Sequence, residues 1–262
     1  MPDPVLEVEQ FAAEPEPEWH IYAPTQDDLP CDDGIPMETF RHKLQIDILM
    51  DTYGNWLIAN QQQGFIGGNM FVYFSPDQVR NQDYRGPDVF VVKNVPSGER
   101  RSWVVWQEGK APDVVIELLS PSTAKRDKTE KKQIYQNQLR VTEYFWYDPF
   151  NPEDFAGFGL QRGVYQPLSF DAQQRLWSEQ LGLALVRWQG AYRQVEAIWL
   201  RWATLEGELL PTDGERVEQE RRKAEEERRK AEEERRKAEE ERQRSDRLAA
   251  RLRELGVDPE QL

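Results

Sequence analysis

The chain has 262 residues, enough for one sizeable domain and an appendage, and its formal net charge is −14 at pH 7. A single cysteine, Cys31, excludes an internal disulfide framework and suits a reducing compartment. No apolar run approaches the length of a membrane span, and the first residues lack the basic and apolar blocks of a signal peptide. We therefore expect a cytoplasmic protein with no membrane partner.

The negative charge is concentrated at the beginning of the chain. Residues 1–33 contain ten acids and no Lys or Arg, and they are rich in proline. This composition predicts a poorly ordered acidic leader, which acts either as a solubilising arm or as a regulatory mimic of nucleic acid. Residues 34–214 are close to neutral, so the overall charge does not exclude a nucleic-acid partner.

Helical periodicity from Met37 to about Gln62 predicts a long core helix. Glu38 and His42 stand four residues apart near its start. They face a common site or, alternatively, are a solvated glutamate and a histidine at the edge of the core. Strands follow at residues 65–74 and 88–92, and residues 100–106 are a short strand or a turn.

The most informative stretch begins with the apolar run Val114–Leu119, which is interrupted only by Glu117. A short apolar run of this kind predicts a buried strand, where an ionised carboxylate costs several kcal/mol unless a partner compensates it. Strand parity puts Asp113, Val115 and Glu117 on one face, so Glu117 should emerge near the carboxyl end of the strand beside Asp113.

A lysine-bearing helix is predicted next, from Asp127 to Leu139. Lys131, or its neighbour Lys132, then shares a face with Tyr135 because residues three and four apart are neighbours on a helix. An aromatic strand at residues 141–147 completes a βαβ unit.

Short aromatic segments separated by Gly, Pro and Asn follow Pro149 and predict antiparallel hairpins. Their aromatic side chains are either core residues or a platform for stacking nucleic-acid bases, and core residues are the more common case.

The tail repeats RRKAEEE with a period of seven across residues 221–241. A stable coiled coil needs two apolar positions per heptad, and this repeat supplies one, at Ala224, Ala231 and Ala238. Favourable i,i+4 pairs of Glu with Arg or Lys predict a solvent-exposed helix with weak self-association at most. We expect deletion of residues 215–262 to leave the melting temperature of the body nearly unchanged.

Asp88 and Glu117 lie on successive predicted strands, and two carboxylates that converge at strand ends are the ligands Mg²⁺ prefers. A nearby ammonium group could orient the attacking water and offset negative charge on a scissile phosphate.

Five motifs carry a family resemblance: GGNMFVYFS, RGPDVFVV, SWVVWQEGK, PDVVIELLSPSTAKRDKTEKKQIYQ and VTEYFWYDP. They occur in the order and spacing of the Uma-two family of restriction endonucleases, within the PD-(D/E)XK nuclease superfamily, over about residues 37–149. The resemblance implies an α/β fold with a restriction-endonuclease-like core of a helix, three strands, a helix and a further strand. Antiparallel β additions and a charged C-terminal helix complete the expected chain, in three parts: leader 1–33, nuclease-like domain 34–210 and charged heptad-repeat helix 211–262.

The resemblance also implies the site. Asp88 and Glu117 match the two acidic positions of the motif and are the expected metal ligands. Leu119 occupies the usual lysine position, so Lys131 on the following helix is the candidate replacement. Glu38 is a further candidate acid, and Asp113 and Tyr135 are additional candidates.

Two functions remain open. The first is an endonuclease that cuts DNA with Mg²⁺, or with Mn²⁺ in its place, as a homodimer formed mainly by the body. The second is a catalytically inactive nuclease fold that acts as a scaffold and assembles through its helical tail. The retained acids and lysines favour the enzyme, whereas Leu119 and the lack of a dense basic face favour the scaffold.

Overall fold

A computed structural model describes residues 23–31, 39–75, 78 and 86–254. Its centre is a six-stranded sheet in the order β1-β3-β5-β6-β7-β8. β5 and β6 run parallel, and all other neighbours in this sheet are antiparallel. The strands are β1 (Gly64–Gly68), β3 (Val89–Lys93), β5 (Val114–Leu118), β6 (Glu143–Tyr147), β7 (Phe155–Gln161) and β8 (Val164–Pro167).

A continuous helical segment, residues 124–139, connects the parallel strands β5 and β6 and completes the predicted βαβ unit. It consists of α4 (Ala124–Arg126), η1 (Asp127–Lys131), α5 (Lys132–Ile134) and η2 (Tyr135–Leu139). Two of its turns are widened to the π form, a feature common at functional sites. The segment ends where Arg140 adopts a left-handed conformation with φ of 53°.

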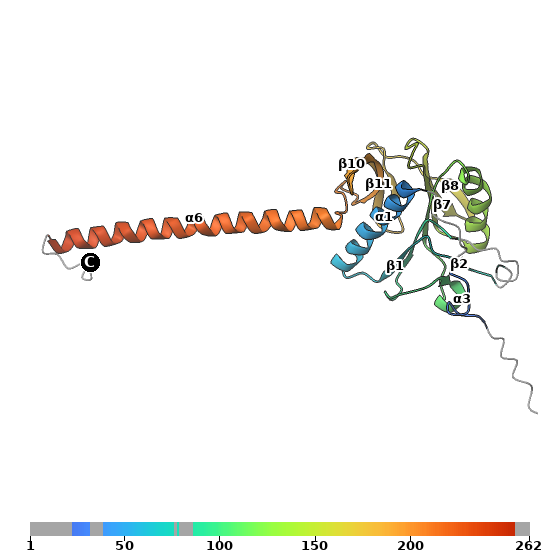
Figure 1. Ribbon diagram of the computed structural model, residues 1–262, viewed down its shortest axis with the longest axis horizontal. Coiled ribbons are helices and arrows are strands. Elements are labelled where there is room, and N and C mark those ends of the chain that lie inside the picture. The colour runs from blue at the N-terminus through green and yellow to red at the C-terminus, as the bar shows by residue number, and fades with distance from the viewer. Residues whose placement is uncertain (1–22, 32–38, 76–77, 79–85, 255–262) are drawn as a thin grey trace, which may run out of the picture.

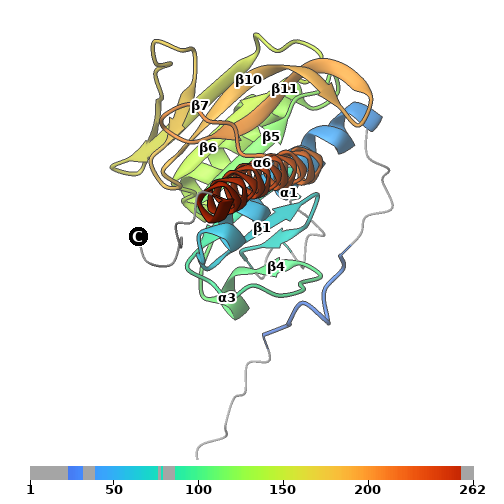
Figure 2. The same ribbon diagram turned by 90° about the vertical axis from the view of Figure 1, so that its left-hand side faces the viewer.

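Helix α1 (Phe40–Ala59) packs against one face of the sheet, and Thr39 caps its first turn by accepting the His42 N–H. A second sheet lies against the same helix, in the order β11-β10-β9, with strands β9 (Leu176–Ser178), β10 (Leu183–Tyr192) and β11 (Val195–Ala203). Figure 2 shows α1 between β1 and the β10–β11 hairpin. The buried Gln45 joins the layers, because its amide bonds to both backbone groups of Leu200.

The predicted hairpins after Pro149 are therefore confirmed, and their large aromatic side chains belong to the core. Trp199 and Trp202 are fully buried beside α1. The predicted order of a helix, three strands, a helix and a strand is also confirmed.

The predicted strand at residues 65–74 is wrong in one respect, because the structure divides it between two sheets. β1 ends at Gly68, and Asn69 turns the chain with φ of 46°, a left-handed conformation that Asn tolerates well. β2 (Val72–Tyr73) then pairs in parallel with β4 (Trp103–Val104), which runs directly into the single-turn helix α3 (Val105–Glu108).

Part of the expected leader packs on this small sheet. Leu29 is buried, the Trp106 indole donates to the Pro24 carbonyl, and the Tyr73 hydroxyl donates to the Pro30 carbonyl. Residues 23–31 are thus attached to the body at several points.

The tail is the 42-residue helix α6 (Asp213–Glu254), which projects from the body (Figure 1). Thr212 and Glu215 form a reciprocal capping box at its start. Glu215 also binds Arg201, whose side chain is 1% exposed, through two hydrogen bonds. Glu215 thus compensates the buried charge of Arg201. A deletion expected to leave the stability of the body unchanged must therefore begin after Glu215 and not at it.

Within the part of the chain that the structure describes, no helix is long and apolar enough to cross a membrane.

Candidate active site

The candidate site is built around Glu117 on β5, which is completely buried. Its two carboxylate oxygens bind different groups of the helical segment 124–139. The Tyr135 hydroxyl donates to Oε1 at 2.6 Å, and the Lys131 ammonium donates to Oε2 at 3.0 Å. The helix that follows the strand thus supplies both partners that the buried acid requires.

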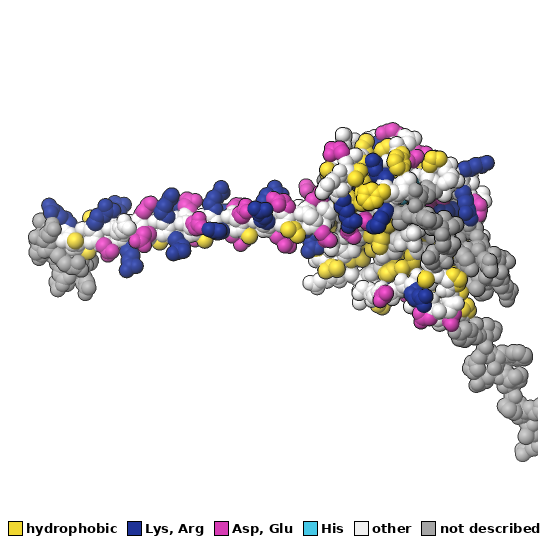
Figure 3. Space-filling model, in the orientation of Figure 1, with side chains coloured by type: hydrophobic (Ala, Val, Ile, Leu, Met, Phe, Trp, Pro, Cys, Tyr) yellow, Lys and Arg dark blue, Asp and Glu magenta, His cyan; other side chains and the backbone are white. Residues whose placement is uncertain are grey.

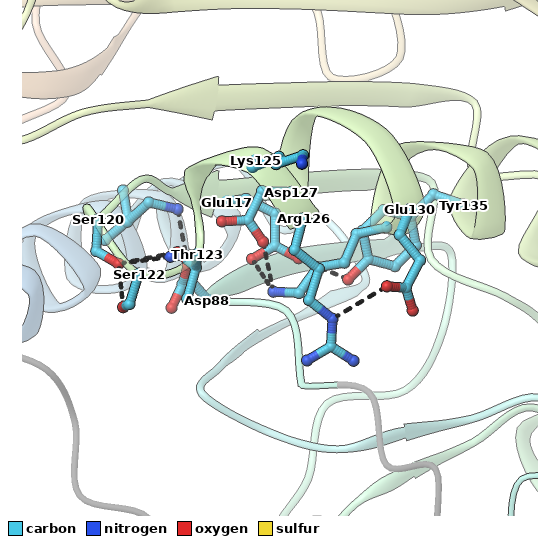
Figure 4. Close-up of polar contacts among 12 residues, drawn as sticks. Asp88, Glu117, Ser120, Ser122, Thr123, Lys125, Arg126, Asp127, Glu130 and Tyr135 are labelled. Atoms are coloured by element: carbon cyan, nitrogen blue, oxygen red, sulfur yellow. Dashed lines mark hydrogen bonds and ion pairs between the residues drawn. The ribbon is translucent and has the colours of Figure 1, made fainter.

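A second acid, Asp127, binds the same lysine one turn earlier on the helix. Its carboxylate is 1% exposed, and Lys131 Nζ lies 2.9 Å from Oδ1. The same ammonium group therefore lies between two buried carboxylates. Figure 4 shows Glu117, Asp127 and Tyr135 gathered beneath the helical segment.

Asp88 immediately precedes β3 and approaches Glu117 from the neighbouring strand. Val89 pairs with Ile116 in the antiparallel register, so one step further Asp88 lies opposite Glu117. Asp88 Oδ2 accepts the Leu118 backbone N–H at 2.7 Å. The register of two strands therefore brings together the two acids that the motif indicated.

The electrostatics of the cluster show an excess of negative charge. Burial, and then the charge of Asp88, raises the pKa of Glu117 to about 7, although Lys131 and Tyr135 oppose the shift. Burial likewise raises the pKa of Asp88 and of Asp127. Burial alone would lower the pKa of Lys131, but Glu117, Asp127 and Asp88 together raise it. One ammonium group thus compensates three acids.

This arrangement fits a hydrated divalent cation better than a fully protein-coordinated one. Among the described residues, no group of three or more His, Cys, Asp or Glu side chains is arranged to hold a metal. Mg²⁺ needs only one or two protein carboxylates because it keeps several waters. Asp88 and Glu117 supply two neighbouring carboxylates whose pKa values are raised mainly by burial, and a cation there would compensate their negative charge.

Asp113 does not join this cluster, so the expectation that Glu117 emerges beside it is wrong. Asp113 immediately precedes β5, at the end of the strand opposite to Glu117, and accepts the Lys93 backbone N–H at 2.7 Å. It also pairs with Lys110 at 2.7 Å, which indicates a structural role.

Glu38 lies outside the described residues, and so does the site that it was expected to share with His42. His42 is buried, and its ring bonds to the Thr39 hydroxyl at 2.8 Å and to the Leu119 carbonyl at 3.2 Å. Leu119, at the usual lysine position, is itself completely buried.

Asp127 is the member of the cluster that sequence reasoning missed. Acids in the first turn of a helix are usually solvated, and the predicted helix began at Asp127. The structure starts the helical segment at Ala124, which puts Asp127 on the same face as Lys131 and Tyr135. The sequence does contain a signal for this shared face, because four residues separate Asp127 from Lys131 and four separate Lys131 from Tyr135.

Comparisons with known proteins identify the family of the chain. No curated protein matches the chain. A crystal structure titled a "putative nuclease belonging to DUF820" from Anabaena variabilis shares 18% sequence identity and a TM-score of 0.39, covering 58% of this chain and 88% of that one. The model of the Uma2 family, described as "Putative restriction endonuclease", matches residues 31–195. Since that match covers more than half of the chain, the chain belongs to the Uma2 family of restriction-endonuclease-like proteins.

Proposed function

We propose that the chain is a Mg²⁺-dependent DNA endonuclease that hydrolyses phosphodiester bonds, with Mn²⁺ as an alternative ion. The observation that carries the proposal is the contact of Lys131 with Glu117. Leu119 occupies the lysine position of the motif. The ammonium group beside Glu117 comes instead from Lys131, on the helical segment that follows β5.

In this proposal, Asp88 and Glu117 hold the metal. A bound Mg²⁺ would polarise the scissile phosphate and lower the pKa of a coordinated water. Lys131 orients the attacking water by a hydrogen bond and offsets the negative charge that builds up on the phosphate. Tyr135 fixes the carboxylate plane of Glu117, and Asp127 holds the lysine side chain in place by their ion pair.

Several basic residues that could contact a DNA backbone are engaged in ion pairs within the protein. Arg100 pairs with Glu108, Lys110 with Asp113, and Lys128 with Asp154. Lys125 and Arg126 are exposed at the start of the helical segment that carries Lys131, although Arg126 also forms an exposed ion pair with Glu130. We propose that these two residues contact the DNA backbone next to the cleaved bond, where each would contribute to the salt dependence of binding.

We further propose that the enzyme works as a homodimer, in which two paired sites cut the two strands of a duplex. The cytoplasm is its proposed location, since a protein with the single exposed cysteine Cys31 suits a reducing compartment.

The test is cleavage of supercoiled plasmid DNA by the purified full chain with Mg²⁺, with Mn²⁺ or with a chelator. We expect nicking and linearisation with either ion and none with the chelator, and Glu117→Gln should remove the activity. An inactive parent protein that binds neither ion would reject the enzyme and leave the scaffold function.

A further inference from the structure

Helix α6 carries a line of small apolar residues along its exposed length. Val217, Ala224, Ala231 and Ala238 are spaced by seven residues, and we call this line the alanine seam. Val217 is 65% exposed, and Leu248, in the last two turns of the helix, is 57% exposed. The helix therefore presents an apolar line to solvent from Val217 to Ala238, with a further exposed apolar side chain at Leu248.

Charged columns of opposite sign border the alanine seam on its two sides. On a helix, positions three and four residues after a given residue lie on either side of the line through it. The acidic column, three residues after each seam residue, contains Glu220, Glu227, Glu234 and Glu241. The basic column, four residues after each seam residue, contains Arg221, Arg228, Arg235 and Arg242.

The acidic column takes no part in the ion pairs within α6. The helix pairs Arg221 with Glu225, Arg228 with Glu232, Lys230 with Glu226, Arg236 with Glu240 and Lys237 with Glu233. No ion pair among the described residues involves a glutamate of the acidic column. Figure 3 shows side chains of both signs along the projecting helix. The glutamates beside the seam are thus available to a partner outside the chain.

The alanine seam is turned away from the body. Two hollows lie where α6 meets the body, and the helix residues that line them are Gly214, Glu215, Arg216, Glu218, Gln219, Glu220, Arg222 and Lys223. Val217, in the middle of this range, lines neither hollow, and no residue from Ala224 onward lines either of them. Figure 1 shows the helix projecting from the body. A second molecule can therefore reach the seam without displacing any contact of the body.

We propose that α6 pairs with α6 of a second copy along the alanine seam, with the two helices parallel and in register. A two-fold axis parallel to the helices places the acidic column of each copy against the basic column of the other, on both edges of the seam. An antiparallel arrangement would place acidic against acidic and basic against basic. The charge pattern thus selects both the partner and its direction.

The spacing along the helix axis also fits. Glu227 and Arg228 differ in height by one residue, about 1.5 Å, so Glu227 of one copy meets the partner's Arg228 at nearly the same level. The same holds for Glu234 with the partner's Arg235. The small alanine side chains let the helices approach closely enough for these contacts.

The chemistry of the alanine seam sets the strength of the pairing. Only one position per heptad is apolar, so the seam buries little surface and interhelical ion pairs carry much of the attraction. Such exposed pairs are screened by salt. Self-association should therefore be concentration-dependent and should weaken as salt rises from about 0.05 to 0.5 M.

Charge exchange on the full chain tests the proposal, with sedimentation equilibrium as the readout and circular dichroism to verify that α6 remains helical. One variant makes both columns basic, with Glu227→Arg, Glu234→Arg and Glu241→Arg. The other makes both columns acidic, with Arg228→Glu, Arg235→Glu and Arg242→Glu. We expect each variant alone to associate at least about tenfold more weakly than the parent, because like charges replace three attractive contacts on each edge. A mixture of the two variants should restore the dimer.

A matched control carries the same change of charge on the side of α6 opposite the alanine seam, with Glu226→Arg, Glu233→Arg and Glu240→Arg. It should associate as the parent does. A parent protein that stays monomeric at low salt would overturn the proposal, and so would a dimer that survives in both charge-exchange variants.

Cross-linking tests the direction of the helices. In a Cys31→Ser background, Ala224→Cys should form an intermolecular disulfide with itself under mild oxidation, because parallel helices in register bring position 224 of both copies together. Failure of Ala224→Cys to cross-link with itself, combined with ready cross-linking of Ala224→Cys to Ala238→Cys, would show antiparallel helices and overturn the proposed geometry.

Discussion

Lys131 and Glu117 are fourteen residues apart in the chain, yet Nζ of the lysine lies 3.0 Å from Oε2 of the glutamate. The contact joins a buried strand to the helix that follows it. It explains how this chain can place leucine at position 119 and still keep an ammonium group beside its acids.

The first prediction concerns the pH dependence of stability in the absence of divalent metal. The pKa of Glu117 rises from 4.5 to about 7 on folding, so the folded protein retains a proton that the unfolded chain releases. The free energy of unfolding should therefore fall as pH rises from about 4.5 to 7, by at most about 3 kcal/mol from this residue. Denaturant titrations at pH 5 and pH 8 measure the difference.

Glu117→Gln should reduce that fall in stability, because an amide cannot ionise. Mg²⁺ should stabilise the parent more at pH 8 than at pH 5, since protonated acids bind the ion poorly. A parent protein equally stable at both pH values, with no response to Mg²⁺, would show that the acids do not compete for protons and metal at this site.

The second prediction concerns Tyr135, whose hydroxyl donates to Glu117 at 2.6 Å in a buried setting. Tyr135→Phe leaves a carboxylate oxygen without its donor and should cost about 1–3 kcal/mol of unfolding free energy at pH 8. Cleavage should fall about tenfold, because Glu117 is then oriented less precisely.

Tyr165→Phe is the matched control, because Tyr165 donates to the Val141 carbonyl at 2.9 Å in the same part of the core. It should also reduce stability but should leave the cleavage rate within about twofold of the parent, since it touches no acid of the site. Equal losses of cleavage in the two variants would mean that Tyr135 acts only through stability.

The third prediction compares the stability of two truncated chains, one that keeps the first residues of α6 and one that lacks the whole helix. Deletion of residues 219–262 retains Glu215 and its bonds to Arg201, so the melting temperature should stay nearly unchanged. Deletion of residues 213–262 leaves the buried Arg201 without its carboxylate partner. The cost should be on the order of 2 kcal/mol, less than for a fully buried pair because the side chain of Glu215 is 40% exposed. Calorimetry of both truncated chains measures the difference, and equal melting temperatures would refute a stabilising role for the Arg201–Glu215 pair.

Sequence reasoning was most successful where periodicity and burial agree. The apolar run around Glu117 predicted a buried strand, and helical spacing placed Lys131 or Lys132 on the face of Tyr135; the structure puts Lys131 beside the acid. The sequence placed Asp88 and Glu117 on successive neighbouring strands, and the structure adds the antiparallel register that sets them opposite each other.

The missed features depend on contacts between distant segments. Asp127 becomes a buried acid because its helix packs it beside Lys131 and near Glu117 of β5. Asn69 divides an apparently continuous apolar strand by adopting a left-handed turn. The partnership of Arg201 with Glu215 joins a hairpin to the tail, and neither segment predicts the other by its own pattern.

The central claim is that Lys131 acts as the lysine of the nuclease site, and the most direct test compares Lys131→Met with Lys132→Met. Lys132 is the next residue on the same helix, but its ammonium lies over the Phe158 ring, 3.3 Å from the centroid, away from the acids. Both variants remove one positive charge, and circular dichroism with Mg²⁺ present verifies that each is folded.

The measurement is the single-turnover rate of DNA cleavage at saturating Mg²⁺. We predict that Lys131→Met lowers the rate by about 100-fold or more, equivalent to roughly 3 kcal/mol of transition-state stabilisation, while the Mg²⁺ concentration for half-maximal rate changes little. Lys132→Met should cleave at nearly the parental rate. Equal and small effects of the two substitutions would contradict the account.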